Sequence, residues 1–340
     1  MIRRRSLMML LVIILWLAAP GGAAAQVFVS SGGMGDALIF QLIETTNLDT
    51  LIAIESFSLS TSVHKVRFRD GTTGAPVLEF ELCLIPSSTW TASVFRVGSM
   101  TRVVSATTHP IDGVPTMLNK TLTGNPTRAF MEVIGLRATL DASSSTAICT
   151  NPALGGDVEN TALMGKAYYV NGSGTPPLVY GASAVALADF AFTEIDNGTV
   201  FGNEDVAQAL IDEGFFGSFF FSTRFFVPAS FGAATQVVLT FPTGPTSVGC
   251  LSCNVPDDFQ ITPFNEAGDP LTTINLPLTT SLVRVITLSS SDIASDSGLL
   301  EITETSAPEF FPIPLVGFGI NTTSPGAPLF FNALFPIAKE

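Results

Sequence analysis

The sequence predicts an all-β protein: an antiparallel β-sandwich of the immunoglobulin-like type, built either as one unit or as two packed β-domains with one short helix. Two observations lead to this prediction. Apolar and polar residues alternate with a period of two over many short runs, which is typical of half-buried strands. Turn residues, drawn from 29 Gly and 22 Pro, recur in places at the intervals of about 8–12 residues that a sandwich requires.

The clearest pair of strands lies between His64 and Arg96. Apolar residues at 66 and 68 alternate with Lys65, Arg67 and Arg69, and apolar residues from 78 to 84 alternate with Glu79, Glu81 and Cys83. Turn residues between the two runs predict a hairpin. We expect a register with Phe68 opposite Phe80, Arg69 opposite Glu79, Arg67 opposite Glu81 and Lys65 opposite Cys83. The arginines could bind an acidic ligand, but their acidic partners favour a solvated, charge-paired face.

The other elements follow in chain order. Strands are expected over 36–40, 50–55, 90–97, 100–107, 127–139, 163–170, 177–184, 236–241, 259–264, 282–288, 299–304 and 315–320, whereas 182–192 fits either a helix or a strand. A loop is expected over 143–152, and His64 and His109 have the setting of ordinary strand-end and surface histidines. The one short helix is expected over 203–213, where Asn203 is a suitable N-cap and Gly214 a suitable end.

The first 25 residues have the pattern of a secretory signal peptide. Arg3, Arg4 and Arg5 precede a short apolar run over 7–19, and the alanines at 23–25 form a small-residue cleavage site before Gln26. A retained membrane anchor is the alternative, but the run is short for a span. We therefore expect a secreted protein of a bacterium, extracellular, at the cell surface or periplasmic, with no integral membrane span after the leader is removed. The expected domains are an N-terminal β-sandwich over 26–200 and a C-terminal β-rich domain over 201–340, although no linker marks the boundary.

Charge and hydropathy limit the classes of partner. Without the three leader arginines, 12 basic residues remain against 29 acidic ones, a formal charge of −17. This acidity argues against binding nucleic acid or anionic membrane surfaces. Apolar residues make up 46% of the chain, with 27 Phe, and charged residues only 13%. Such a chain has to bury or expose many phenylalanines, and a large exposed apolar area usually marks a partner, so self-association into a homo-oligomer or surface assembly is expected.

Four cysteines, Cys83, Cys149, Cys250 and Cys253, allow three disulfide pairings. We favour Cys83–Cys149 and Cys250–Cys253, because an exported chain forms disulfides readily. The closely spaced second pair could instead be a redox or zinc motif. However, Pro256 breaks the helix that a redox cysteine uses to lower its thiol pKa, and the only two histidines lie far away in the sequence.

Aromatic residues are the candidates for a ligand or interface site. The segment over 215–226 has seven phenylalanines in twelve residues. It fits a ligand platform, a membrane-dipping loop, an interface or, as we favour, a core strand with aromatics on both faces. Tyr168 and Tyr169 are further candidates. The residues proposed for the site are Trp90, Phe215, Phe216, Phe219, Phe220 and Phe221.

No catalytic or cofactor motif is recognised in the chain. It has no G-x-S-x-G, H-E-x-x-H, P-loop or dinucleotide fingerprint. Carboxylate pairs of the glycosidase type exist at Glu79/Glu81 and Asp257/Asp258, and loose calcium sites are conceivable at Asp257/Asp258 or over 265–269. We therefore expect no enzyme activity, no catalytic or metal residues and no cofactor, with calcium as the one alternative.

The order of several short motifs carries a family resemblance. It runs through GDALIF at 35–40, DTLI at 49–52, VRFR at 66–69, LCL at 82–84 leading to WTA at 90–92, MEVIG at 131–135, ICTNP at 148–152 and PLVGF at 314–318. In this order the chain resembles a group of uncharacterised exported bacterial β-rich proteins, over most of its mature length. Gln41 stands where the group has Pro, and Glu55-Ser56 stands where an Asn-Thr turn is usual. The resemblance implies the fold, export and a Cys83–Cys149 pair, but no activity.

These observations lead to one hypothesis and two alternatives. The leading hypothesis is an exported structural or adhesive β-protein that assembles with itself and has no catalytic activity. The first alternative is a carbohydrate- or peptide-binding module that uses the aromatic residues named above. The second is a glycosidase-like enzyme.

Overall fold

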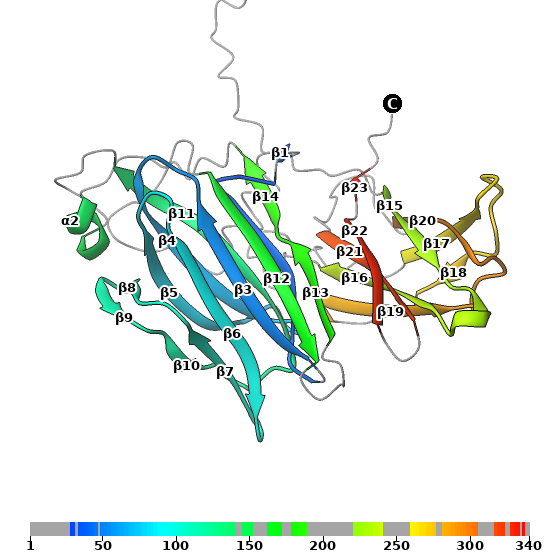
Figure 1. The fold of residues 1–340 in the computed structure, drawn as a ribbon, viewed down its shortest axis with the longest axis horizontal. Coiled ribbons are helices and arrows are strands. Elements are labelled where there is room, and N and C mark those ends of the chain that lie inside the picture. Colours follow the sequence, from blue (N-terminus) through cyan, green and yellow to red (C-terminus); the bar gives the residue numbers. More distant parts are fainter. Residues whose placement is uncertain are drawn as a thin grey trace, which may run out of the picture.

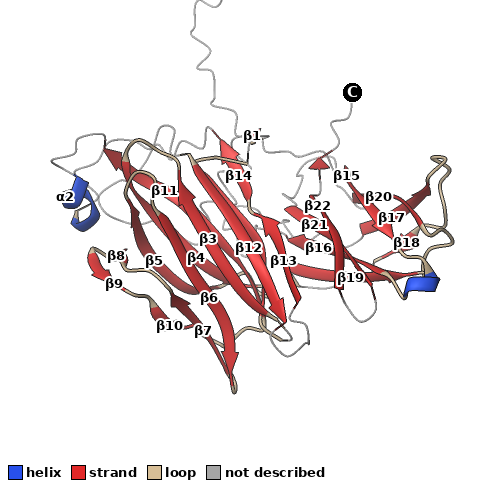
Figure 2. Cartoon of the chain, in the orientation of Figure 1, coloured by secondary structure: helices blue, strands red, loops and turns tan. Residues whose placement is uncertain are grey.

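The structure, a computed structural model, is almost entirely β (Figure 2). It describes residues 28–30, 33–46, 48–139, 145–151, 162–171, 178–188, 220–240, 259–276, 281–304, 316–323, 327–333 and 335–336. Every strand pairing within these residues is antiparallel, and α2 (Ser145–Thr150) is the only α-helix among them. The prediction of an all-β antiparallel sandwich is therefore confirmed. The predicted signal peptide, the helix over 203–213 and the boundary at residue 200 lie outside the described residues.

Two sheets form the N-terminal half, at the left of Figure 1. The eight-stranded first sheet has the order β1 (Phe28–Val29), β14 (Val185–Ala188), β2 (Ala37–Glu44), β11 (Arg128–Thr139), β4 (Thr61–Asp70), β5 (Pro76–Leu84), β8 (His109–Ile111) and β9 (Val114–Thr116). The six-stranded second sheet has the order β10 (Asn119–Thr121), β7 (Met100–Ser105), β6 (Thr89–Val97), β3 (Asp49–Ser56), β12 (Leu163–Asn171) and β13 (Leu178–Ser183).

Two smaller sheets form the C-terminal half, at the right of Figure 1. The third sheet has the order β18 (Ile274–Asn275), β17 (Phe259–Asn265), β20 (Ser297–Glu304), β15 (Phe220–Phe226) and β23 (Phe335–Pro336). The fourth has the order β19 (Val283–Ser289), β16 (Ala234–Thr240), β21 (Val316–Thr323) and β22 (Ala327–Ala333). The buried Asn321 joins these two sheets, because its Oδ1 accepts hydrogen bonds from the Phe226 backbone N–H at 2.8 Å and from Thr235 Oγ1 at 2.5 Å.

The first two sheets pack face to face over an apolar core. Phe80 of the first sheet lies against Trp90 of the second, with ring centroids 5.9 Å apart. At Gly165 the sheets approach so closely that a Cβ would lie 2.6 Å from the Phe40 ring, so only glycine fits without a rearrangement. Alternate side chains of each strand point into this core, as the period-2 pattern of the sequence requires.

The two halves share one continuous apolar cluster. Tyr169 of β12 stacks on Phe318 of β21 with ring centroids 6.1 Å apart, and its hydroxyl donates to the Leu42 carbonyl at 2.9 Å. The Thr240 hydroxyl of β16 donates to the Gln41 carbonyl of β2. Residues some 200 positions apart in the chain are thus joined by both packing and hydrogen bonds.

The β4–β5 hairpin forms as predicted, but the predicted register was wrong by two residues. Arg67 lies opposite Glu79 and Phe68 opposite Leu78, not opposite Glu81 and Phe80. The loop is tighter than expected because Asp70 Oδ1 accepts the backbone N–H groups of Thr72 and Thr73, at 2.8 and 2.7 Å. A slip of two keeps each side chain on its predicted face, and therefore the division into an apolar and a charged face holds.

The segment over 143–152 was expected to be a loop, whereas it contains helix α2. Its Ile148 and Cys149 pack on Val63, Cys83 and Leu136, in a small apolar cluster on the outer face of the first sheet. Cys83 and Cys149 form a disulfide with Cα atoms 5.4 Å apart, which confirms that predicted pair. Cys250 and Cys253 lie outside the described residues.

His64 is not an ordinary strand-end histidine, because it is fully buried on the face of β4 that also carries Val66 and Phe68. Its Nε2 hydrogen-bonds the buried Ser62 hydroxyl at 2.7 Å. Burial disfavours the charged imidazolium and lowers the pKa of His64 to about 3. The imidazole is therefore neutral in the folded protein at every pH near neutrality.

We expect His64 to make the fold sensitive to acid. Its folded-state pKa lies below the unfolded value of 6.5, so the unfolded chain takes up the proton first and stability falls as the pH drops from 6.5 towards 3. The loss from this group approaches about 1.4 kcal/mol per pH unit. Chemical denaturation as a function of pH measures it. The His64→Gln variant should lose less stability over this range, while His109→Gln, at a partly exposed position, should behave like wild type; equal slopes in all three would contradict the assignment.

We expect the Cys83–Cys149 bond to contribute strongly to stability. It spans 66 positions, and by the chain-entropy relation a loop of that length is worth about 4 kcal/mol. Urea denaturation of Cys83→Ala, Cys149→Ala and the double variant measures the loss. Either single substitution breaks the bond, so each should destabilise the protein nearly as much as both together. A loss below about 1 kcal/mol in all three would show that the bond constrains little.

Candidate functional site

Two of the aromatic side chains proposed from the sequence belong to the core. Trp90 is 0% exposed beneath Phe80, and Tyr169 is also 0% exposed between the two halves. Neither ring can reach a ligand at the surface without unfolding its surroundings, so the proposal of Trp90 as a ligand residue is corrected. Tyr168 points the other way on the same strand and is 37% exposed, lying against Gly181 of β13.

The phenylalanine-rich segment is described only in part. Phe215, Phe216 and Phe219 lie outside the described residues, and Phe220 and Phe221 are described only as backbone within β15. Further along that strand, the Phe225 side chain is buried in the core at 1% exposure. At this one position the strand interpretation of the segment fits, and an exposed platform does not.

The arginines of β4 lie in a buried ion-pair network. Arg69 Nε donates to Glu132 Oε2 at 2.8 Å, and Arg69 Nη1 donates to the Gly74 carbonyl at 3.0 Å. Arg67 pairs with Glu79 through Nε, and its Nη1 lies 3.9 Å from Glu132 Oε2. The sequence predicted that this charged face is solvated, and that prediction was wrong. The side chains of Arg67, Arg69 and Glu132 are only 1%, 3% and 1% exposed.

This network is a structural element and not a patch for an acidic ligand. In the ion pairs given above, each guanidinium group faces a carboxylate, and burial removes Arg67, Arg69 and Glu132 from solvent. The sequence does not reveal Glu132 as a partner of the hairpin, because this residue reaches the hairpin from β11, more than sixty residues away. The available signal was one charged residue within the apolar run from Phe130 to Ile134.

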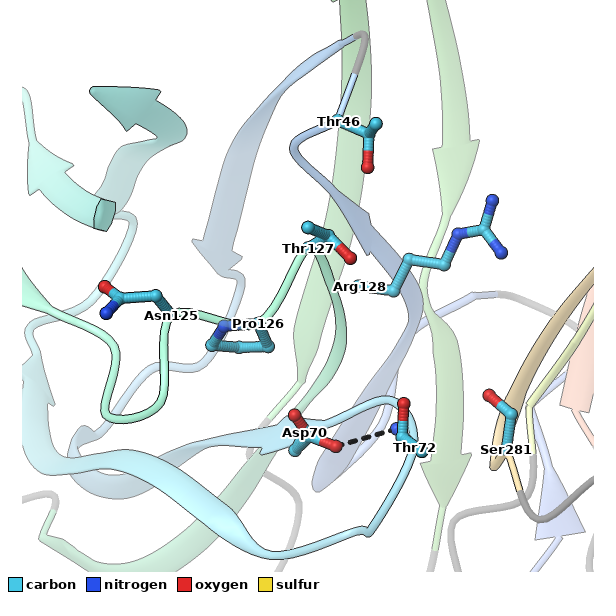
Figure 3. Close-up of a pocket in the computed structure, with 8 residues that line it drawn as sticks. All are labelled: Thr46, Asp70, Thr72, Asn125, Pro126, Thr127, Arg128 and Ser281. Atoms are coloured by element: carbon cyan, nitrogen blue, oxygen red, sulfur yellow. Dashed lines mark hydrogen bonds between the residues drawn. The ribbon is translucent and has the colours of Figure 1, made fainter. Parts of the chain in front are cut away.

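A polar pocket lies where the N-terminal sandwich meets the C-terminal half (Figure 3). Its volume is about 460 Å³, within the range of small-molecule sites. Four segments line it, from the end of β2, the β4–β5 loop, the start of β11 and the residue two before β19. The lining residues are Thr46; Asp70 and Thr72; Asn125, Pro126, Thr127 and Arg128; and Ser281.

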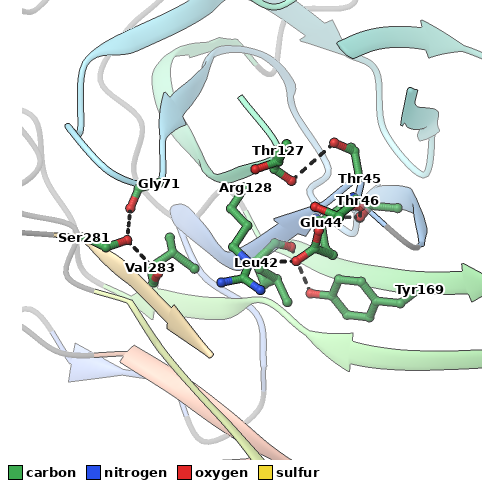
Figure 4. A network of polar contacts seen from close by, with 11 residues as sticks. Leu42, Glu44, Thr45, Thr46, Gly71, Thr127, Arg128, Tyr169, Ser281 and Val283 are labelled. Carbon is green, nitrogen blue, oxygen red and sulfur yellow. Dashed lines mark hydrogen bonds and ion pairs between the residues drawn. The ribbon is translucent and has the colours of Figure 1, made fainter. Parts of the chain in front are cut away.

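Hydrogen bonds hold each wall of this pocket in place (Figure 4). Glu44 accepts from the Thr46 backbone N–H at 2.8 Å through Oε1 and from Arg128 Nε at 2.8 Å through Oε2. Thr45 donates to the Thr127 carbonyl through its backbone N–H at 3.0 Å and its hydroxyl at 3.2 Å. These contacts fix the end of β2 against the start of β11.

Gly71 joins the remaining walls. Its N–H donates to the Arg128 carbonyl at 2.9 Å, and its own carbonyl accepts from the Val283 N–H at 2.8 Å and the Ser281 hydroxyl at 2.9 Å. A Cβ here would lie 2.9 Å from the Arg128 oxygen and 3.2 Å from Val283 Cβ, so a side chain would push the halves apart. The walls of the pocket are therefore held by backbone and side-chain contacts between distant segments, which no motif in the sequence predicts.

The carboxylate candidates show no catalytic or metal arrangement among the described residues. Glu79 is paired with Arg67, and Asn265 and Asp269 close a turn in which Asn265 Oδ1 accepts from the Ala267 and Asp269 N–H groups, both at 2.9 Å. In the part of the chain that the structure covers, no group of His, Cys, Asp or Glu is placed to hold a metal ion. Asp257 and Asp258 lie outside the described residues.

No helix in the part of the chain that the structure describes is long and apolar enough to cross a membrane.

Comparison of the chain with protein-family models, with curated proteins and with solved structures found no match.

We expect Glu132 to be far more important for stability than Glu79. Replacing one partner of a buried ion pair leaves the other charge buried and uncompensated, which typically costs about 3–5 kcal/mol. Glu132→Gln removes the carboxylate that lies near both Arg69 and Arg67, whereas Glu79→Gln leaves Arg67 with Glu132 3.9 Å from its Nη1. Urea denaturation of both variants measures the difference. Equal losses, or a larger one for Glu79→Gln, would contradict this account of the network.

Proposed function

We propose that the protein is an exported structural or adhesive β-protein of the bacterial cell surface or extracellular space, without catalytic activity. The observation that carries this proposal is the continuity of the fold: four sheets share one apolar cluster, and a disulfide ties α2 to β5. A shared core and a disulfide raise the free-energy cost of opening one sheet by itself, which suits a structural or adhesive protein outside the cell.

Export is supported by three features of different kinds. The first 25 residues have the signal-peptide pattern. The Cys83–Cys149 bond suits an oxidising compartment, because the reducing cytosol keeps most thiols free. The acidic, charge-poor mature chain suits a protein that meets neither nucleic acid nor anionic lipid.

The carbohydrate- or peptide-binding alternative loses part of its basis, since Trp90 and Tyr169 are core residues. The glycosidase-like alternative needs two carboxylates flanking a substrate. Among the described residues that line the pocket, only Asp70 has a carboxylate, and its Oδ1 already closes the β4–β5 loop. No specific observation favours catalysis over a structural role.

Self-association is supported by an apolar surface at one end of the N-terminal sandwich, which we call the end patch. Phe57, Leu59 and Ile85 are 51%, 86% and 54% exposed there. The β3–β4 and β5–β6 connections that carry them are joined by the Ser56 N–H, which donates to the Ser88 carbonyl at 2.9 Å. The Ser58 and Ser60 hydroxyls bond each other at 2.6 Å beneath the first connection, so Phe57 and Leu59 are held outwards.

The partner proposed for the end patch is a second copy of the chain. A patch on a two-fold axis meets its own equivalent, and an apolar surface is complementary to itself as a charged one is not. The second copy is less suited to pair as an added strand with the edge strands β9 and β10 of the first two sheets. These are exposed strands of three residues that contain Pro115 and Lys120, two residue types that block pairing with another chain.

We expect the oxidised chain over 26–340 to associate with increasing concentration in sedimentation velocity. Leu59→Ser combined with Ile85→Ser should shift the protein towards the monomer, because it removes apolar area from the end patch. The matched control is Val97→Ser with Met100→Ser, at the other end of β6, where both side chains are 46% exposed. Wild type that stays monomeric at all concentrations, or two double variants that behave alike, would refute assembly through the end patch.

A further inference from the structure

The pocket between the two halves has no role in the structural function proposed above. Its residues come from four separate segments, and each segment is anchored by hydrogen bonds to backbone or to its neighbours. Asn125 is held in the same way, because its Oδ1 accepts from the Thr101 N–H at 3.1 Å. The cavity is therefore formed before any ligand arrives, which lowers the entropic cost of binding.

Size separates the classes of ligand that such a cavity can take. A bare cation needs oxygen ligands that converge to about 2.3–2.6 Å from one point. A space of about 460 Å³ is far larger than that and matches a small organic molecule. The pocket is too small for a folded partner.

Charge narrows the class further. Arg128 is neutralised through Nε by Glu44, and Asp70 adds a carboxylate to the lining. Arg128 and Glu44 therefore cancel each other, and the remaining carboxylate, Asp70, already accepts the Thr72 and Thr73 N–H groups through Oδ1. Neither an anion nor a cation finds a free opposite charge among the described lining residues, which favours a neutral ligand with both donors and acceptors.

The chemistry of the lining residues decides which neutral molecules fit the pocket. Hydroxyl groups dominate it, and the side-chain oxygens of Thr46, Thr127 and Ser281 are turned towards the space between the segments (Figure 3). Among the described residues that line the pocket, Pro126 is the only one with an apolar side chain and none is aromatic, so no aromatic ring of theirs would stack on a nucleobase. We propose that this pocket binds a neutral polyhydroxylated molecule, a monosaccharide or one sugar residue of a glycan, between the N-terminal loops and Ser281.

This site is distinct from an aromatic platform. Hydroxyl, amide, carboxylate and guanidinium groups exchange hydrogen bonds with the sugar hydroxyls, and the ligand bridges the two halves of the fold through Thr127 and Ser281. Because Ser281 belongs to the C-terminal half, a bound sugar stabilises the native docking of the two halves and raises the midpoint of thermal unfolding.

The test uses the oxidised chain over 26–340 and saturation-transfer NMR with glucose, galactose, mannose, xylose and N-acetylglucosamine. At least one sugar should bind, and Thr46→Val and Thr127→Val should each weaken its affinity about fivefold, the usual effect of one lost hydrogen bond. The contacts described above use the Thr46 backbone N–H and the Thr127 carbonyl and not the two hydroxyls, so we expect both variants to fold. The matched control is Thr121→Val, at an exposed position of β10, which should bind like wild type.

Four outcomes would overturn the proposal. They are binding of no sugar in the panel, affinity unchanged in both pocket variants, loss of binding in Tyr168→Ala instead, and stronger binding of phosphate or Ca²⁺ than of any sugar in competition. The third would move the site to the open face of the second sheet. These outcomes come from ligand binding, whereas the proposed self-association is tested by sedimentation. Failure of one proposal therefore leaves the other standing.

Discussion

The ion pair between Arg69 and Glu132 is the interaction on which the rest of the fold depends. A buried guanidinium needs a carboxylate partner, and for Arg69 the neighbouring strand β11 supplies one in Glu132. By pairing with β4, β11 occupies the middle of the first sheet between β2 and β4. Its far end leads to α2 and the Cys83–Cys149 bond, so the network and the disulfide act on the same face of the sheet.

The start of β11 has equal importance for how the halves meet. Arg128 there pairs with Glu44 and accepts the Gly71 N–H, and Gly71 in turn accepts from Val283 of the C-terminal half. The pocket is a consequence of this meeting, because three connections and Ser281 converge without filling the space between them. A surface of hydroxyls held by backbone contacts is suited to recognition, whereas the buried network beside it serves stability.

Much of the fold could be predicted because strand formation is encoded locally. The alternation in β4 and β5 placed both strands and sorted their side chains between two faces, and turn residues placed their connection. The register failed by two because it depends on how Asp70 closes the loop, a contact that alternation does not encode. Trp90 failed as a ligand candidate for a related reason: an aromatic residue in an alternating strand looks the same whether its face meets the core or solvent.

The sequence by itself determined the all-β class and the order of the strands along the chain, since these follow from periodicity and turn chemistry. Four cysteines left three pairings open, and the structure decided for Cys83 with Cys149. Only the tertiary structure decided that Arg67 and Arg69 are buried and that both lie near Glu132, a carboxylate from a distant strand. It also decided the burial of His64 and the existence of the pocket, whose walls come from residues as far apart as Thr46 and Ser281. Periodicity reports which face a side chain occupies, but contacts across the fold decide what covers that face.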